Sequence, residues 1–189
     1  MKPVFLCAHG AGGHQDDRSM RALAETLSGA GLEVLRFNFP YVERGSKRPD
    51  PMPVLMEAIR EKARSNPSVL LGGRSMGGRA ASMLAAEGFP CAGLMLFAYP
   101  LHPAGKPEKL RDAHLARIPV PVLSFSGTRD PLCTRGLMEN AVGVLPGWTQ
   151  HWLEGADHSF RVLKSSGRSD TDVMKEVGEA TARWLKLRA

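Results

Sequence analysis

Three residues of the 189-residue sequence have the types that nucleophilic catalysis requires: Ser75, Asp130 and His158. A serine hydroxyl is a poor nucleophile until a base takes its proton. Histidine can act as that base because the ordinary pKa of its imidazole is about 6.5. A carboxylate fixes the tautomer of the imidazole and stabilises its charged form. This combination predicts acyl transfer, with Ser75 as nucleophile, His158 as base and acid, and Asp130 orienting the imidazole.

The surroundings of Ser75 favour the role of nucleophile. Residues 73–77 read Gly-Arg-Ser-Met-Gly, after an apolar run over 68–71 and before an alanine-rich segment. Between a strand and a helix, this G-x-S-x-G pattern holds the serine in a strained conformation at a sharp turn. Glycines are needed there because other side chains would collide with neighbouring backbone. The same pattern occurs in ordinary tight turns and in phosphate-binding loops, so the assignment depends on the rest of the chain.

An oxyanion that develops during acyl transfer needs two hydrogen-bond donors. We expect the backbone N–H groups of Met76 and Ala11 to supply them, with Gly12 as the alternative to Ala11. Ala11 lies in a glycine-rich loop that follows the apolar run over 3–8. This loop does not match the dinucleotide-binding pattern G-x-G-x-x-G, because position 15 is glutamine.

Two other residues compete for the acid and base roles. Asp157 is adjacent to His158, but neighbouring side chains seldom point so that one supports the other's ring, so we favour Asp130. His102 is a second candidate base, although its proline-rich surroundings favour a structural or pocket role. Asp130 is also expected to cap the helix that follows, with Pro131 in its first turn, and both roles are compatible if different carboxylate oxygens are used.

Residues near the predicted strand ends are candidates for the wall of a substrate pocket: Gly12, Tyr41, Arg74, Tyr99 and His102. Arginines close to the three reactive residues in sequence suggest a second hypothesis, a preference for anionic acyl groups. The alternative is that these side chains pair with carboxylates or face solvent. The arginines concerned are Arg74, Arg79, Arg129 and Arg161.

Apolar segments alternate with segments of helical periodicity, which predicts an α/β fold. We expect a doubly wound, mostly parallel six-stranded sheet flanked by helices, in a single domain over residues 1–189. The predicted strands are 3–8, 33–39, 68–71, 91–98, 121–125 and 149–153, and the predicted helices include 53–66 and 171–187, the latter capped by Ser169 or Asp170. Parallel strands end at one edge, so Ser75, Asp130 and His158 should converge there. Residues 40–53 are expected to form an irregular loop, and the segment after residue 98 is too short for a lid domain.

Composition narrows the functional classes. The net charge is +6, but the basic residues are dispersed and no aromatic residues are interleaved with them, so we expect no nucleic-acid partner. No run of 18 apolar residues and no signal-peptide pattern is present, so we expect no membrane association. Three separated cysteines, Cys7, Cys91 and Cys133, are typical of reduced thiols in a cytoplasmic protein. Neither a metal nor a cofactor is expected from the motifs.

Taken together, residues 9–13, 73–79, 99–103, 127–130 and 155–158 resemble the α/β-hydrolase superfamily over nearly the whole chain. The chain order Ser, Asp, His is the order found in that fold. The chain is similar to a small lidless branch near the dienelactone hydrolases, which includes uncharacterised bacterial hydrolases and a vertebrate testis-expressed protein. Dienelactone hydrolases use cysteine where this chain has Ser75, and the two leading antiparallel strands usual in the superfamily are missing. The resemblance implies a serine hydrolase acting on a small ester or thioester. The alternative is a non-catalytic binding or scaffold protein that keeps the fold.

Overall fold

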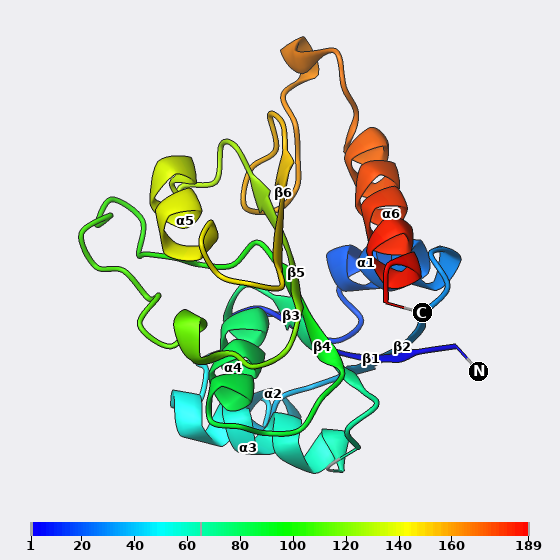
Figure 1. Ribbon diagram of the computed structural model, residues 1–189, viewed down its shortest axis with the longest axis vertical. Coiled ribbons are helices and arrows are strands. Elements are labelled where there is room, and N and C mark those ends of the chain that lie inside the picture. The colour runs from blue at the N-terminus through cyan, green and yellow to red at the C-terminus, as the bar shows by residue number, and fades with distance from the viewer. Residues whose placement is uncertain (1, 65, 189) are drawn as a thin grey trace.

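The computed structural model describes residues 2–64 and 66–188, and within them six short segments form one parallel sheet (Figure 1). Four of these segments are buried along almost their whole length, as suits strands that are covered on both faces: Val4–Ala8, Leu70–Arg74, Gly93–Phe97 and Val122–Gly127. The strand order is β2-β1-β3-β4-β5-β6 and every neighbouring pair is parallel, which confirms the predicted α/β class. The strands are β1 (Val4–Ala8), β2 (Glu33–Phe37), β3 (Leu70–Arg74), β4 (Gly93–Phe97), β5 (Val122–Gly127) and β6 (Trp148–Leu153).

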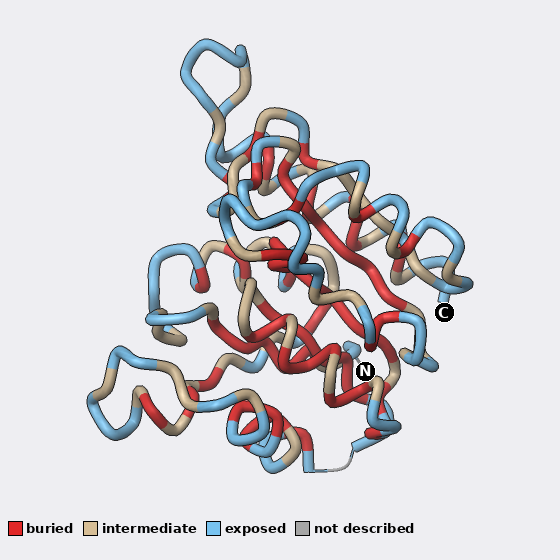
Figure 2. The backbone as a smooth tube through the Cα atoms, turned by 90° about the vertical axis from the view of Figure 1, so that its left-hand side faces the viewer, coloured by how far each residue is buried: buried red, intermediate tan, exposed pale blue. Residues whose placement is uncertain are grey.

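Helices cover both faces of the sheet, as Figure 1 shows. α1 and α6 lie on one side and the other α-helices on the opposite side, so two apolar cores form, one on each face. Figure 2 shows the strands buried at the centre and the helices exposed along their outer sides. The α-helices are α1 (Arg18–Gly29), α2 (Pro40–Glu43), α3 (Met52–Ala63), α4 (Met76–Ala86), α5 (Arg135–Val142) and α6 (Asp170–Lys186). Two 3-10 turns are η1 (Leu115–Arg117) and η2 (Lys164–Ser166).

Several predicted boundaries need correction. The prediction that residues 40–53 are irregular is wrong at both ends, because α2 begins at Pro40 and α3 at Met52. Proline at the first helical position favours a helix start, and the fully buried ring of Tyr41 anchors the short α2 turn. The helix predicted to end at residue 66 stops at Ala63, because Arg64 adopts a left-handed conformation.

The C-terminal helix matches its predicted cap. The Ser169 side chain accepts a hydrogen bond from the backbone N–H of Asp172, and the Asp172 carboxylate accepts one from the backbone N–H of Ser169. This reciprocal pair satisfies two amides at the start of α6 that have no partner within the helix. In the part of the chain that the structure describes, no helix is both long and apolar enough to traverse a lipid bilayer.

Two features of the fold position the candidate residues. The carboxyl ends of all six strands lie at one edge of the sheet, where β3 continues into α4 and where the loops after β5 and β6 begin. The connection between β4 and β5, residues 98–121, runs beside α4 and contains only η1 as a helical turn (Figure 1). The edge near α4 is therefore bordered by a short loop rather than by an inserted domain.

Candidate active site

Ser75 occupies a strained turn between β3 and α4. Its backbone dihedral angles are φ 46° and ψ −115°, a combination that L residues rarely adopt. The turn is held by a 2.9 Å hydrogen bond from the Ser75 N–H to the carbonyl of Phe97 on β4. A Cβ atom at Gly73 would lie 2.0 Å from the Ala8 carbonyl oxygen, and one at Gly77 would lie 2.6 Å from the His9 carbonyl oxygen. Both positions therefore require glycine, as the sequence pattern indicated.

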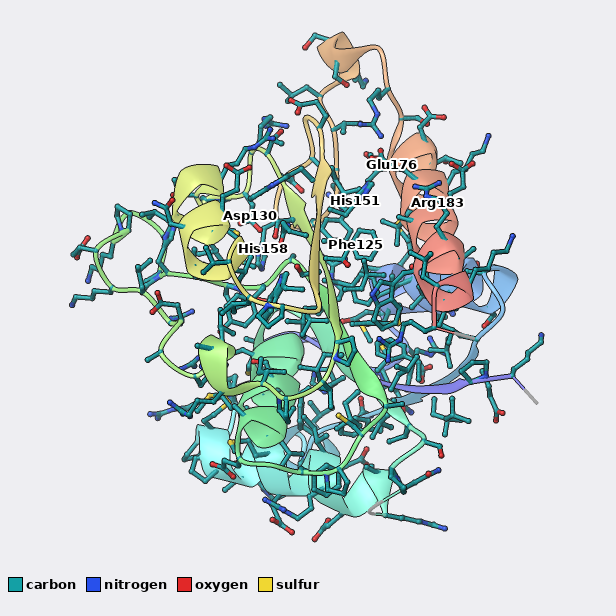
Figure 3. All side chains as sticks on the ribbon, in the orientation of Figure 1. Phe125, Asp130, His151, His158, Glu176 and Arg183 are labelled. Carbon is teal, nitrogen blue, oxygen red and sulfur yellow. The ribbon has the colours of Figure 1, made fainter. Side chains whose placement is uncertain are left out.

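His158 links the other two reactive residues to this turn. Its Nε2 lies 2.9 Å from the Ser75 Oγ, and its Nδ1 lies 2.7 Å from Oδ2 of Asp130. Asp130 follows β5 and His158 follows β6, and Figure 3 shows the two side chains together at that edge of the sheet. With the Nδ1 proton donated to the carboxylate, Nε2 is left to accept the proton of the serine hydroxyl. The structure thus brings together the three residues that sequence reasoning selected.

The Asp130 carboxyl group is fixed by two partners. Its side chain is 0% exposed, whereas the His158 side chain is 26% exposed and so remains reachable from solvent. Oδ1 accepts the backbone N–H of Leu132 at 2.8 Å while Oδ2 faces the imidazole, so each oxygen has its own role. Asp130 does not cap a helix as expected, because α5 begins only at Arg135 and the Oδ1 contact closes a turn instead.

Asp157, the competing acid, is engaged elsewhere. Its Oδ1 accepts hydrogen bonds from the backbone N–H groups of Ser159 at 2.7 Å and Arg161 at 3.0 Å. These contacts fold the loop that carries His158 back on itself. The Asp157 carboxylate therefore shapes the loop, and its recorded contacts do not include the imidazole of the next residue.

Arg74 holds the backbone of His158, a contact that sequence reasoning missed. Its guanidinium donates to the His158 carbonyl at 2.8 Å and lies 5.0 Å from the centroid of the Phe160 ring. Burial lowers the pKa of Arg74, with the carboxylates of Asp130 and Asp157 among the groups that oppose this effect. Arg74 was expected on the wall of a substrate pocket, but the structure places its head group beneath the histidine loop. The alternation of side chains along β3 could have indicated this. Arg74 lies on the same face of the sheet as Leu70, and α4 covers the opposite face.

The glycine-rich loop after β1 lies against the nucleophile. A Cβ atom on Gly10 would be 3.6 Å from the Ser75 Cβ, so the backbone of this loop passes directly beside Ser75. No acceptor among residues 2–64 and 66–188 takes a hydrogen bond from the backbone N–H of Ala11 or of Met76. Met76 is the first residue of α4, where amides are free of helical partners and the helix dipole is positive. Both amides therefore lie beside Ser75 without an acceptor in the described part of the chain.

His9 anchors this loop and was not singled out by sequence reasoning. Its Nε2 accepts the backbone N–H of Phe39 at 3.2 Å, so its Nδ1 carries the proton and donates to the Gly10 carbonyl at 2.8 Å. The Gly13 N–H donates to the same carbonyl at 3.1 Å. The His9 ring is fully buried, and burial lowers its pKa, so the neutral form is favoured. The neutral ring ties the loop to the end of β2.

The structure places His102 in the interior rather than beside Ser75. The residue is only 3% exposed, and both ring nitrogens are engaged. Nδ1 lies 3.0 Å from the Pro103 carbonyl, while Nε2 accepts the Thr134 N–H at 3.1 Å and lies 2.9 Å from its hydroxyl. His102 therefore fastens the β4–β5 connection to the start of α5.

The two tyrosines expected in the pocket are also enclosed. Tyr41 and Tyr99 are both 0% exposed. The Tyr99 hydroxyl donates to the carbonyl of Arg111 at 2.6 Å, which joins two parts of the β4–β5 connection. Gly12 alone among the expected pocket residues remains exposed, with a φ of +66° in the loop beside Ser75. The open side of the site is therefore bordered by backbone of the glycine-rich loop.

The remaining titratable groups give no sign of a metal centre. Within the described residues, no group of three or more His, Cys, Asp or Glu side chains is arranged to hold a metal ion. The three cysteines are buried and unpaired. Burial raises the pKa of Cys7 to about 12 and that of Cys133 to about 11, so both thiols stay protonated near neutral pH.

A family model described as an alpha/beta hydrolase domain matches residues 1–186. Among solved structures, Est1E from Butyrivibrio proteoclasticus superposes with a TM-score of 0.71 at 16% identity, covering 97% of this chain and 87% of that one. A dienelactone hydrolase from Anabaena variabilis gives 0.69 at 22% identity, covering 98% and 86%. A monoacylglycerol lipase from Paleococcus ferrophilus gives 0.68 at 18%, covering 96% and 94%. At these identities the structural likeness establishes the fold.

Proposed function

Because the chain belongs to the alpha/beta hydrolase family, we propose that it is a serine hydrolase that cleaves a small carboxylic ester or thioester through an acyl-enzyme. The observation that carries this proposal is the pair of contacts made by the His158 ring. Its Nδ1 lies 2.7 Å from Oδ2 of Asp130, and its Nε2 lies 2.9 Å from the Oγ of Ser75. Distances of this size are those at which a base can take a proton from a nucleophile.

In the proposed reaction, the Ser75 Oγ attacks the carbonyl carbon of the substrate while His158 Nε2 takes the hydroxyl proton. The carbonyl oxygen becomes an oxyanion and accepts hydrogen bonds from the backbone N–H groups of Met76 and Ala11. Collapse of this intermediate breaks the bond to the alcohol or thiol, which leaves with the proton from Nε2. A water molecule then gives a proton to Nε2 and attacks the acyl-enzyme, which restores the Ser75 hydroxyl and releases the acid. No cofactor enters these steps.

The distribution of charge supports the same assignment. Asp130 is fully enclosed and lies against the imidazole, so it stabilises the imidazolium that forms when Ser75 loses its proton. The two free amides provide donors where negative charge develops, and loss of one such donor typically costs about 3 kcal/mol of transition-state stabilisation. The short β4–β5 connection leaves the site without a lid, which favours small substrates whose leaving group extends into solvent.

A fluorophosphonate probe and a series of 4-nitrophenyl esters and acyl thioesters test the proposal. We expect the wild type to be labelled and to hydrolyse the shorter esters, and Ser75→Ala to be unlabelled with kcat/KM lower by at least about 10³-fold. Ser159→Ala is the matched control, because this exposed serine lies in the His158 loop and its hydroxyl has no recorded contact. Equal labelling of wild type and Ser75→Ala would overturn the assignment. Absence of both labelling and hydrolysis in the wild type would favour the non-catalytic binding protein.

A further inference from the structure

Arg79, one helical turn beyond the nucleophile, has no carboxylate partner among the residues that the structure describes. The backbone N–H of Arg79 donates to the Ser75 carbonyl at 3.0 Å, so the two residues are neighbours along the same side of α4. Helical side chains lean toward the N-terminus of their helix. The Arg79 side chain therefore leans from α4 toward the turn that carries Ser75.

The guanidinium of Arg79 is incompletely satisfied. Its Nε is buried and has no hydrogen-bond partner, and the structure records none for its other nitrogens within the described residues. No carboxylate in the same part of the chain lies within 4.0 Å of Arg79 or of Arg111. The Arg111 side chain donates one long hydrogen bond, 3.4 Å from Nη1 to the Pro100 carbonyl.

Arg111 is brought to Arg79 by the β4–β5 connection. The Tyr99 hydroxyl donates to the Arg111 carbonyl at 2.6 Å, and the Tyr99 ring lies 6.4 Å from the ring of His114. His114 Nε2 lies 2.8 Å from the hydroxyl of Ser82 on α4, which donates to the Arg79 carbonyl at 2.8 Å. After burial, the charge of Arg79 is the next largest cause that lowers the pKa of Arg111. Burial, together with the charges of Arg79 and Arg117, lowers the pKa of His114 to about 4, so His114 stays neutral near pH 7. The charges of Arg79 and Arg111 thus belong to one cluster around a neutral imidazole.

The local acid does not neutralise these arginines. Asp112 is next to Arg111 in the sequence, but within the described residues it forms no ion pair with either guanidinium. A partly buried cation without a counter-charge is costly, and a bound anion would remove that cost. Proteins use guanidinium groups for this purpose because their planar fork matches a carboxylate in a bidentate geometry.

The other arginines that suggested a preference for anionic acyl groups have different surroundings. Arg74 is bonded to the His158 carbonyl, and Arg129 donates to the Gly155 carbonyl at 3.1 Å. Arg161 is exposed to solvent. Arg79 therefore differs from the rest of the set in having a buried, unpaired nitrogen one turn from the nucleophile.

We propose that Arg79 and Arg111 form a subsite for a carboxylate at the far end of the acyl chain. The preferred substrate is then a half-ester or half-thioester of a dicarboxylic acid, and this inference rests on the proposed hydrolase function. One turn of an α-helix is about 5.4 Å, which suits a short acyl chain of roughly four methylene groups between the carbonyl that Ser75 attacks and the bound carboxylate. Ser75 attacks the carbonyl of the ester or thioester, which lies at the other end of the acyl chain from the carboxylate.

The kinetic test compares mono-4-nitrophenyl adipate with its methyl-capped diester. We expect the wild type to prefer the charged ester by about tenfold in kcat/KM, since one charge-assisted contact contributes that much or more. Arg79→Gln and Arg111→Gln should each reduce this ratio toward one, and Arg79→Lys should keep part of it. Arg117→Gln is the control, because it removes an equal charge from the same connection at an exposed position bonded to the Ala113 carbonyl. Equal wild-type kcat/KM on the two esters would overturn the subsite. So would an Arg117→Gln variant whose ratio of kcat/KM falls as far as that of the Arg79 and Arg111 variants.

A binding test separates this inference from the proposed function. Ligand-observed NMR with Ser75→Ala measures binding of adipate, with adipamide as the neutral analogue. We expect adipate to bind in preference to adipamide, and that preference to be lost when Arg79→Gln or Arg111→Gln is added. Retained adipate binding by a protein that hydrolyses no ester would overturn the hydrolase proposal and keep the subsite. Hydrolysis of both esters without selective adipate binding would overturn the subsite and keep the hydrolase proposal. Using two arginine variants keeps the test valid if one of them fails to fold.

Discussion

The nucleophile and its base are held in place by two different kinds of structure. The turn at Ser75 is fixed by backbone, because Gly73 and Gly77 let β3 and α4 approach Ala8 and His9 more closely than any side chain would allow. The loop that carries His158 is fixed by side chains: Arg74 holds its carbonyl, Asp130 holds its ring, and Asp157 folds it.

The difference between these two regions determines how each should fail. A change at the turn forces whole strands apart, so fold and activity should be lost together. A change in the histidine loop removes one hydrogen bond from several, so activity should fall while the protein stays folded. The following substitutions test this contrast, beginning with the largest expected effect.

Gly73→Ala should abolish both stability and activity. The new Cβ would lie 2.0 Å from the Ala8 carbonyl oxygen, at a φ of +146°, so β1 and β3 could not stay paired. Gly136→Ala is the control, because a Cβ there meets nothing within 4 Å and alanine favours the helix α5 by about 0.5–1 kcal/mol. Urea unfolding monitored by circular dichroism measures both. A folded, active Gly73→Ala protein would contradict the view that backbone contact fixes the turn.

Asp130→Asn should leave the fold intact and lower kcat/KM by about 10³–10⁴-fold. The amide oxygen can keep the contact with the Leu132 N–H, which turns the NH₂ group toward His158 and favours the wrong tautomer. Asp157→Asn should cost much less, because that side chain accepts backbone amides and its contacts do not include the imidazole. Steady-state kinetics on one ester compares the two. If Asp157→Asn were the more damaging change, the acid would have to be reassigned.

Arg74→Met should reduce kcat by about 10- to 100-fold with little change in KM. It removes the charge-assisted bond to the His158 carbonyl but keeps apolar volume next to Phe160. Arg74→Lys should recover part of the loss, because its ammonium can reach the same carbonyl. Comparison of kcat with KM, together with the thermal midpoint, distinguishes positioning from folding. A rise in KM at constant kcat would show instead that Arg74 contacts substrate.

Lowering the pH should destabilise the protein through His9, which anchors the loop beside the Ser75 turn. We expect this loss of stability to be the smallest of the effects predicted here. Burial lowers the pKa of His9 below its ordinary value of 6.5. As the pH falls below 6.5, the unfolded chain binds a proton that the folded chain excludes, so the free energy of unfolding decreases. His9→Gln lacks this group, and its loss of stability between pH 7.5 and 5.5 should be smaller than that of the wild type. Urea titrations at the two pH values measure the difference, and identical losses would count against a neutral His9.

The contrast between the two regions also explains what the sequence could predict. The turn is encoded in five consecutive residues, so its strained serine and required glycines could be recognised locally. The strands were predictable because their apolar runs are long enough to be buried on both faces. The helix α2 was not, because four residues are too few to show a helical period.

The histidine loop was only partly predictable. Position after a strand end identified Asp130 and His158 as candidates, since parallel strands end at one edge. The bond from Arg74 to the His158 carbonyl joins residues 84 positions apart, and no local pattern reports such a contact. For the same reason the sequence could not show that Tyr99 and His102 are buried, with Arg111 and Thr134 as their partners.

The two fixed oxygens of Asp130 have a consequence for the rate of the proposed reaction. Because Oδ1 is held by the Leu132 N–H and Oδ2 by the imidazole, the entropy of orienting this carboxylate is lost when the chain folds rather than when a substrate arrives. Each turnover then begins with the imidazole already in its reactive tautomer. Differences in rate between substrates should accordingly arise from how well each acyl chain is held and how readily its leaving group departs.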